Sequence, residues 1–177
     1  MNRFLITTLL SCSVLVGCSN SVSPNSKFYL LHNASDGVKG ASAAPVEKLK
    51  VQFPDYLKQP NLAMKLTSHQ LHYAQYHKWA EPLAVSFKKA VKVELKKQSQ
   101  QSKTIPALFI DVEHFHVSEH ASVILSGSYQ IMMKDLNKKQ HFDFYIEQKL
   151  AEDGYDHAVI QQRKLVTKLV SEIIQSW

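Results

Sequence analysis

Cysteine is almost absent from this 177-residue chain, because Cys12 and Cys18 are its only two and both lie near the start. The chain beyond residue 18 therefore cannot form an internal disulfide, and its stability must come from packing. Glycine is also scarce, with five residues that form no phosphate-cradling loop. Blocks of basic residues with interleaved aromatics are missing, so the net charge of +6 is too diffuse to indicate nucleic-acid binding.

Apolar runs are short, and none reaches the roughly 20 residues that a membrane-spanning helix needs. The most prominent run follows Arg3, covers residues 4–16 and is closed by Gly17 and Cys18. A basic start, a short apolar stretch and a small residue before the cleavage point are typical of a removed export signal. We expect residues 1–17 to be a lipoprotein signal peptide and Cys18 to become the acylated first residue. Two or more acyl chains on that cysteine would give a stable anchor.

The anchor predicts where the protein works. Bacterial lipoproteins as a class resemble this pattern, and Ser19 after the cysteine implies, by that resemblance, sorting to the outer membrane with the folded part in the periplasm. Residues 18–26 are polar and contain Pro24, the composition of a flexible tether. We expect residues 27–177 to form a single domain, since this length is sufficient for one hydrophobic core.

Alternation and turn residues predict the order of elements along the domain. The loops between the three long strands are short, which requires antiparallel neighbours and therefore a meander. The expected elements are strands over residues 27–31 and 46–53, a turn over 56–60, a hairpin of 62–66 and 71–76, a helix opened by Glu81 and Pro82, strands over 105–117, 121–134 and 140–150, and a last helix over 156–176 with Asp156 as its N-cap.

The helix after Pro82 has two different faces. Leu83, Phe87, Val91 and Leu95 recur every four residues and form an apolar stripe, which favours packing against a core over insertion into a membrane. The other side carries the lysines Lys88, Lys89, Lys92, Lys96 and Lys97. A basic face of this kind suits solvent, lipid headgroups or an acidic partner.

The sequence gives little support for a catalytic or metal site. A metal site could be formed by His114, His116 and His120. No carboxylate or cysteine accompanies them at a known spacing, however, so a polar strand face is the favoured interpretation. Asp111 and Glu113 are interpreted as solvated strand residues. The run of residues 126–128 (Ser-Gly-Ser) lies within a strand and is not a nucleophile elbow. We therefore expect no catalytic residue, no metal and no cofactor.

Three segments carry a family resemblance: FYLL at residues 28–31, QFPDYLKQP at 52–60 and HKWAEPL at 77–83. In order and spacing they resemble the PqiC (YmbA) family, the auxiliary lipoproteins of MCE-type transport systems. The chain departs from the usual family pattern at Lys58, Gln59 and Lys65. The residues to which the resemblance assigns a structural or interface role are Pro54, Asp55, Tyr56, Leu57, Pro60, Trp79, Glu81 and Pro82.

The resemblance implies an α/β fold whose central sheet is mixed, largely antiparallel, and packed against two main helices. It further implies a lipoprotein of the outer membrane that works with an inner-membrane transport component and a tube-forming MCE-domain protein to move lipid, and that forms a ring-like homo-oligomer. The alternatives are an envelope hydrolase, a metal-dependent enzyme or a generic periplasmic binding lipoprotein.

Overall fold

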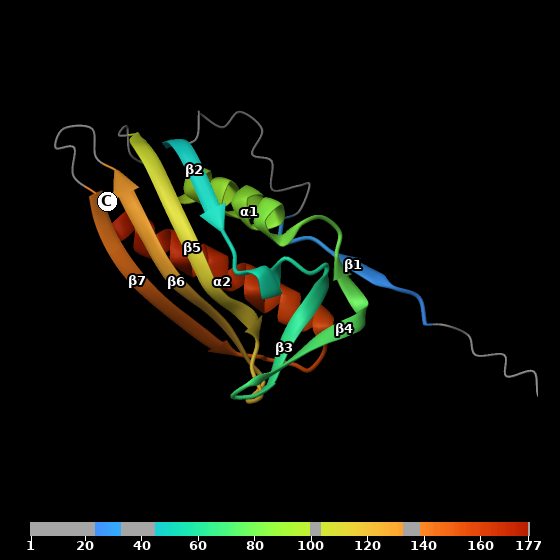
Figure 1. The fold of residues 1–177 in the computed structure, drawn as a ribbon. Coiled ribbons are helices and arrows are strands. Elements are labelled where there is room, and N and C mark those ends of the chain that lie inside the picture. Colours follow the sequence, from blue (N-terminus) through green and yellow to red (C-terminus); the bar gives the residue numbers. More distant parts are fainter. Residues whose placement is uncertain (1–23, 33–44, 100–103, 133–138, 177) are drawn as a thin grey trace, which may run out of the picture.

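The structure, a computed structural model, describes residues 24–32, 45–99, 104–132 and 139–176. The expected signal peptide and Cys18 lie outside these residues. Figure 1 shows the arrangement of the elements. They are, in chain order, β1 (Lys27–Tyr29), β2 (Val46–Gln52), the 3-10 turn η2 (Asp55–Leu57), β3 (Asn61–Thr67), β4 (Gln70–Trp79), α1 (Leu83–Gln98), β5 (Ile105–Val117), β6 (Ser122–Met132), β7 (Lys139–Lys149) and α2 (Tyr155–Gln175).

The strands form one mixed sheet in the order β1-β4-β3-β5-β6-β7, with β2 also paired to β5. β5, β6 and β7 are antiparallel neighbours, which confirms the predicted meander. β3 and β4 form the predicted hairpin. β1 runs parallel to β4, and both β2 and β3 run parallel to β5. The fold class expected from the resemblance is therefore confirmed.

One edge of β5 is shared by two strands. β2 pairs with its first half, from Val46 opposite Ile105 to Gln52 opposite Asp111. β3 pairs with its last residue, Val117. The η2 turn connects β2 to β3 and therefore lies beside the stretch of β5 that neither strand covers.

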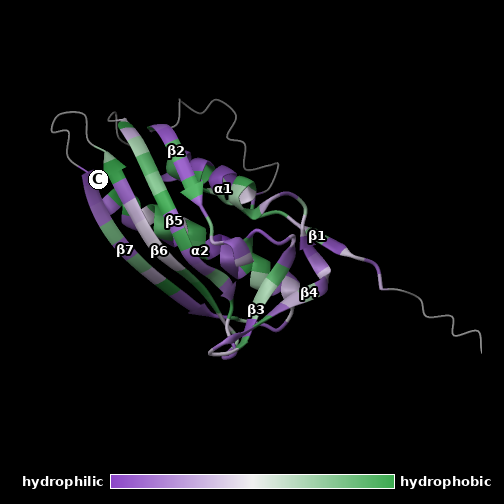
Figure 2. Ribbon diagram, viewed as in Figure 1, coloured by the Kyte–Doolittle hydropathy of each residue, from purple (hydrophilic) through white to green (hydrophobic). Residues whose placement is uncertain are grey.

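Both helices lie on the same side of the sheet (Figure 1), with α2 against β5, β6 and β7 and α1 against β2 and α2. Hydrophobic and hydrophilic residues alternate along the long strands (Figure 2), as expected when one face is packed and the other is not. All four residues of the predicted α1 stripe are buried. Phe87 from this stripe makes edge-on ring contacts with Phe53 and Phe115, so the stripe packs into the sheet.

Several predicted element boundaries were wrong. The first strand ends at Tyr29 instead of residue 31, and β4 extends to Trp79 instead of residue 76. The N-cap of α2 is Gly154, with φ +116°, and Asp156 lies in the first turn of that helix. Helix α1 begins at Leu83, so Pro82 is its N-cap and Glu81 precedes it. β6 begins at Ser122 because Ala121 has φ +52°, a turn conformation that no strand residue adopts.

A β-bulge bends the meander. The pairing of β5 with β6 shifts register between Val112 and His114, so Glu113 has no opposite residue. Gly127 pairs with Val112 at this point, and a Cβ added there would lie 2.0 Å from the Asp111 carbonyl oxygen. The Ser-Gly-Ser run at 126–128 therefore serves the close approach of two strands, which only glycine permits here.

Candidate functional site

The three segments that carry the resemblance meet in space. The Trp79 amide donates to the Pro60 carbonyl over 2.7 Å, and the Ala80 amide donates to the Tyr29 carbonyl over 2.8 Å. Tyr29 is also the register partner of Trp79 in the β1/β4 pair. We call the residues 28–31, 54–60 and 79–82 the motif junction. Three segments, the first and last of which are about 50 residues apart in the sequence, thus form one hydrogen-bonded unit.

Tyr56 connects the η2 turn to the bulge in β5. Its hydroxyl donates to the Glu113 carbonyl over 2.6 Å and lies 3.1 Å from Nδ1 of His114. The Tyr56 carbonyl in turn accepts a bond of 2.9 Å from the Tyr73 hydroxyl. Burial raises the pKa of Tyr56 to about 12. Tyr56 therefore supplies a donor to the bulged residue, in the stretch of β5 that β2 and β3 leave uncovered.

The remaining residues of the turn have separate roles. Leu57 is buried in the core, whereas the side chain of Asp55 is exposed. Lys58 Nζ lies 2.6 Å from the Asp55 carboxylate, and this hydrogen bond lowers the pKa of Asp55. A salt bridge thus forms within the turn although the chain departs from the family pattern at Lys58. Pro54 precedes the turn in an extended conformation. Pro60 is the last residue of the segment, and its carbonyl accepts the hydrogen bond from the Trp79 amide.

Trp79 and Glu81 form the passage from β4 into α1. Trp79 is only 6% exposed. The Glu81 carboxylate forms an ion pair with Lys89 of α1 and lies 3.5 Å from His32 Nδ1. Buried Ser86 accepts a hydrogen bond of 3.0 Å from the Leu31 amide. These contacts tie the start of α1 to the chain that follows β1.

A ring cluster that the sequence did not reveal joins β1 to α2. The Tyr29 hydroxyl lies 2.8 Å from His77 Nδ1, and the His77 ring stacks on Tyr155 with centroids 3.7 Å apart. Burial and a hydrogen bond to Asp156 raise the pKa of Tyr29, and the same bond lowers the pKa of Asp156. The one sequence signal for this ring cluster was that Tyr29 belongs to the FYLL segment of the family resemblance.

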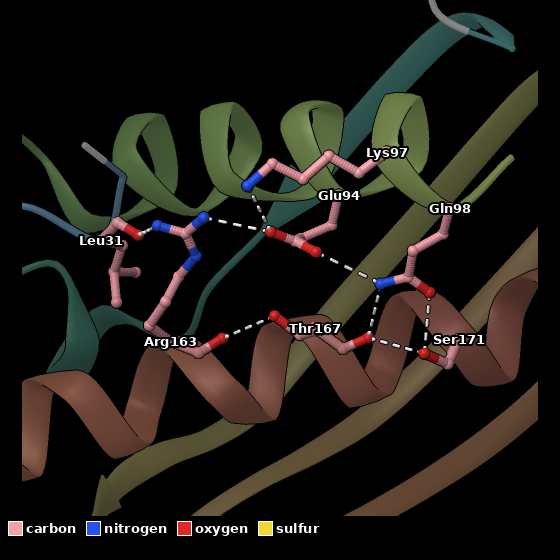
Figure 3. Close-up of polar contacts among 7 residues, drawn as sticks. All are labelled: Leu31, Glu94, Lys97, Gln98, Arg163, Thr167 and Ser171. Atoms are coloured by element: carbon pink, nitrogen blue, oxygen red, sulfur yellow. Dashed lines mark hydrogen bonds and ion pairs between the residues drawn. The ribbon is translucent and has the colours of Figure 1, made fainter. Parts of the chain in front are cut away.

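A second unpredicted network connects the chain that follows β1 to both helices (Figure 3). Arg163 of α2 donates to the Leu31 carbonyl over 2.8 Å and to the Glu94 carboxylate of α1 over 3.1 Å. Gln98 donates to the other oxygen of Glu94 and accepts a bond of 2.8 Å from Ser171. Glu94 is 5% exposed, so its charge is held by these partners and by Lys97 in the interface between the helices.

The histidines on β5 have different environments. His114 and His116 share a strand face, with ring centroids 5.5 Å apart. His114 is exposed, but His116 is only 2% exposed, so the interpretation of both as residues of a solvated face was wrong for His116. Burial lowers the pKa of His116. Within the described residues, no group of three or more His, Cys, Asp or Glu side chains could hold a metal.

The basic side of α1 faces solvent. Lys89, Lys92 and Lys96 are exposed, and Lys88 is half-buried. Lys89 is engaged by Glu81 and Lys97 by Glu94. Lys88, Lys92 and Lys96 thus present a positive face that packing does not require.

Comparison with known families decides the identity of the chain. The family model described as "ABC-type transport auxiliary lipoprotein component" matches residues 29–174, which include the whole motif junction except Phe28. The chain belongs to this family. It is therefore a transport accessory lipoprotein by family, and the family is that of a transport component and not of an enzyme. No curated protein matches the chain.

Solved structures share the fold of this family member. A crystal structure titled only as an uncharacterized protein is 20% identical, with a TM-score of 0.68, over 86% of this chain and 99% of its own. A Xanthomonas campestris protein of the DUF330 family is 12% identical, with a TM-score of 0.60, over 73% of this chain and 82% of its own.

In the described part of the chain, neither helix has the length and apolar character needed to span a bilayer.

Proposed function

We propose that this transport accessory lipoprotein is acylated on Cys18, is held at the periplasmic face of the outer membrane, and is the docking component of an MCE-type intermembrane lipid transport system. Its partners are the tube-forming MCE-domain protein and, through it, an inner-membrane transport component. It acts as a homo-oligomer and through a protein–protein surface. The motif junction holds this surface in shape.

The observation that carries the docking role is the positive face of α1. The apolar stripe of this helix is fully used by the core, whereas Lys88, Lys92 and Lys96 have no structural task among the described residues. A cationic face on a rigid helix attracts an acidic partner and speeds the association of the two proteins. Salt weakens this binding because it screens the charges. Trp79 and Glu81 help to position this face, because they fix the start of the helix.

Charge reversal tests the docking surface. The test variant replaces all three lysines: Lys88→Glu, Lys92→Glu and Lys96→Glu. We expect this variant to lose co-purification with the MCE-domain protein from detergent-solubilised membranes. Lys89 is left unchanged because its reversal would place a second carboxylate beside Glu81. The matched control reverses Lys48, Lys50 and Lys149, which are exposed and change the net charge equally. Equal loss in both variants would show a general charge effect and would contradict the α1 docking face.

The anchor is tested separately. Cys18→Ser removes the acylated thiol, so we expect the protein to become soluble or to remain unprocessed. Membrane fractionation together with incorporation of a labelled fatty acid measures both properties. Membrane retention of the serine variant without label would contradict acylation at this residue. Separation of inner and outer membranes then tests the assignment to the outer membrane.

The enzyme alternatives make different predictions for the same protein. A metal-dependent enzyme would bind zinc through His114 and His116, and a hydrolase would turn over an envelope ester. His114 is already bonded to Tyr56, and the Nδ1 of His116 lies 3.2 Å from the Val117 carbonyl. Tight zinc binding that is lost in His114→Ala, or ester turnover by the purified chain, would overturn the docking role.

A further inference from the structure

Three large apolar side chains are exposed where β1 meets α2. Phe28 is 64% exposed, Leu30 is 45% exposed and Ile160 is 54% exposed. Leu30 and Ile160 line an open groove of about 380 Å³. Phe28 lies in β1, two residues before Leu30. We call Phe28, Leu30 and Ile160 the β1/α2 patch. Exposed apolar groups that gather at one place indicate an interaction surface.

Cations surround the β1/α2 patch. Lys78 is the register partner of Phe28 on β4, and Lys164 lines the groove. Lys27 lies at the start of β1, 3.6 Å from Asp156, which is the acidic residue of the groove lining. Apolar side chains flanked by lysines are the pattern of a surface that inserts into the headgroup region of an anionic membrane.

The position of the patch in the chain points to the same occupant. Nine residue steps separate Cys18 from Lys27, and an extended chain spans at most about 3.6 Å per residue, so β1 stays within about 32 Å of residue 18. When residue 18 is held in a bilayer, this tether keeps the patch at a high effective concentration next to the lipid surface. A weak membrane affinity is then sufficient to fix the orientation of the domain.

We propose that the β1/α2 patch is a second membrane contact, in which Phe28, Leu30 and Ile160 enter the headgroup region and the flanking lysines meet anionic lipid. This inference rests on the proposed acylation of Cys18. The contact orients the domain with β1 and the start of α2 against the bilayer. A lipid anchor alone would let the domain rotate freely on its tether.

The test places an environment-sensitive fluorophore at Phe28→Cys or Ile160→Cys in the processed lipoprotein. Cys12 would leave with the signal peptide, and acylation would block Cys18, so labelling is confined to the new cysteine. Tyr145→Cys is the matched control, because Tyr145 on β7 is also 64% exposed. In vesicles of phosphatidylethanolamine and phosphatidylglycerol we expect blue-shifted emission, quenched by spin-labelled lipid, at residues 28 and 160 but not at 145. Equal signals at all three positions would overturn the proposal.

A second measurement separates the patch from the anchor. The mature chain carrying Cys18→Ser and no signal peptide has no acyl chain, so its binding to the same vesicles reports the patch alone. We expect weak, salt-sensitive binding that falls about fivefold in Lys164→Gln, the factor that corresponds to one surface cation, and further in Phe28→Ser. No binding at low salt would overturn the patch and leave the anchor intact. A failure of the wild-type lipoprotein to float with vesicles would instead overturn the anchor.

Two other partners that could cover the β1/α2 patch would give different results in the fluorescence test. If the patch were an interface between copies of this chain, the labels at residues 28 and 160 would be blue-shifted without vesicles, and the shift would follow protein concentration. If an extended protein segment added to the free edge of β1, the blue shift would require the transport partner and not the lipid. Either result would contradict the membrane contact. Circular dichroism of each surface variant checks that the fold is unchanged.

Discussion

Substitution of Gly127 by alanine should damage the fold far more than a single methyl group suggests. The new Cβ would lie 2.0 Å from the Asp111 carbonyl oxygen and 3.0 Å from Cα of Val112, both of which are backbone atoms that no rotamer change can move away. The residue would also have to adopt φ +153°, which side chains other than glycine rarely accept. Relief of the clash requires β5 and β6 to separate at the bulge.

The expected cost follows from three contributions. Overpacking of a close contact costs about 1 to 3 kcal/mol, and a residue held in a sparsely populated backbone region costs about 1 to 3 kcal/mol. The lower entropy of alanine in the unfolded chain offsets about 0.4 to 1 kcal/mol. Because the clash is with backbone, we expect the upper half of this range, about 3 to 5 kcal/mol, for Gly127→Ala.

Gly154→Ala is the matched control. Gly154 also has a positive φ, +116°, but the nearest atom to an added Cβ is His157 Cδ2 at 3.9 Å, so this variant carries the strain without the clash. Urea unfolding followed by far-UV circular dichroism measures both. At a typical slope of about 2 kcal/mol per molar urea, the midpoint should fall by about 2 M for Gly127→Ala and by at most about 1.3 M for Gly154→Ala. A loss in Gly127→Ala no larger than in Gly154→Ala would refute the close-approach explanation.

Three further variants test other parts of the fold. Trp79→Ala should lower the free energy of unfolding by about 3 to 5 kcal/mol because the ring is buried; an unchanged melting curve with loss of transport would make Trp79 an interface residue instead. Burial lowers the pKa of His116 in the folded state, so the unfolded state binds more protons and stability should fall as pH drops below about 6.5, the usual histidine pKa. His116→Phe should reduce this pH dependence, measured by unfolding between pH 7.5 and 5, whereas a variant of exposed His120 should retain it; identical slopes would contradict the assignment. Arg163→Met should cost about 3 kcal/mol, because buried Glu94 loses its Arg163 partner and keeps only Lys97 and Gln98. Glu94→Leu in the same chain should recover much of the loss in a double-mutant cycle; additive losses would show that the pair is not coupled.

Periodicity was sufficient to predict the meander and the buried stripe of α1, because each depends on a repeat within one segment. It carried no information on which strands pair when they are far apart. The parallel pairing of β1 with β4 and the shared edge of β5 are therefore features that only the structure or a family resemblance supplies. The bulge at Glu113 depends on a glycine in the neighbouring strand, so neither strand reveals it alone.

The candidate site was accessible from the sequence only in part. The resemblance selected Tyr56 and Trp79, and the structure shows the hydrogen bonds that each forms. Arg163 and Glu94 lie 69 residues apart on two helices, and nothing in either helical pattern relates them. His116 was misjudged because strand alternation shows which face a residue occupies but not whether the rest of the fold shields that residue from water.

The bond from Arg163 to the Leu31 carbonyl has a mechanical consequence. If the chain is tethered to a membrane at residue 18, any pull between that membrane and the domain enters through β1, which contributes only three residues to the sheet. So short a ladder resists force poorly on its own. The guanidinium of Arg163 continues the line of force past β1 into α2 and, through Glu94, into α1. If such a pull separates β1 from β4, the load next reaches Leu31, where the bond to Arg163 passes it to both helices.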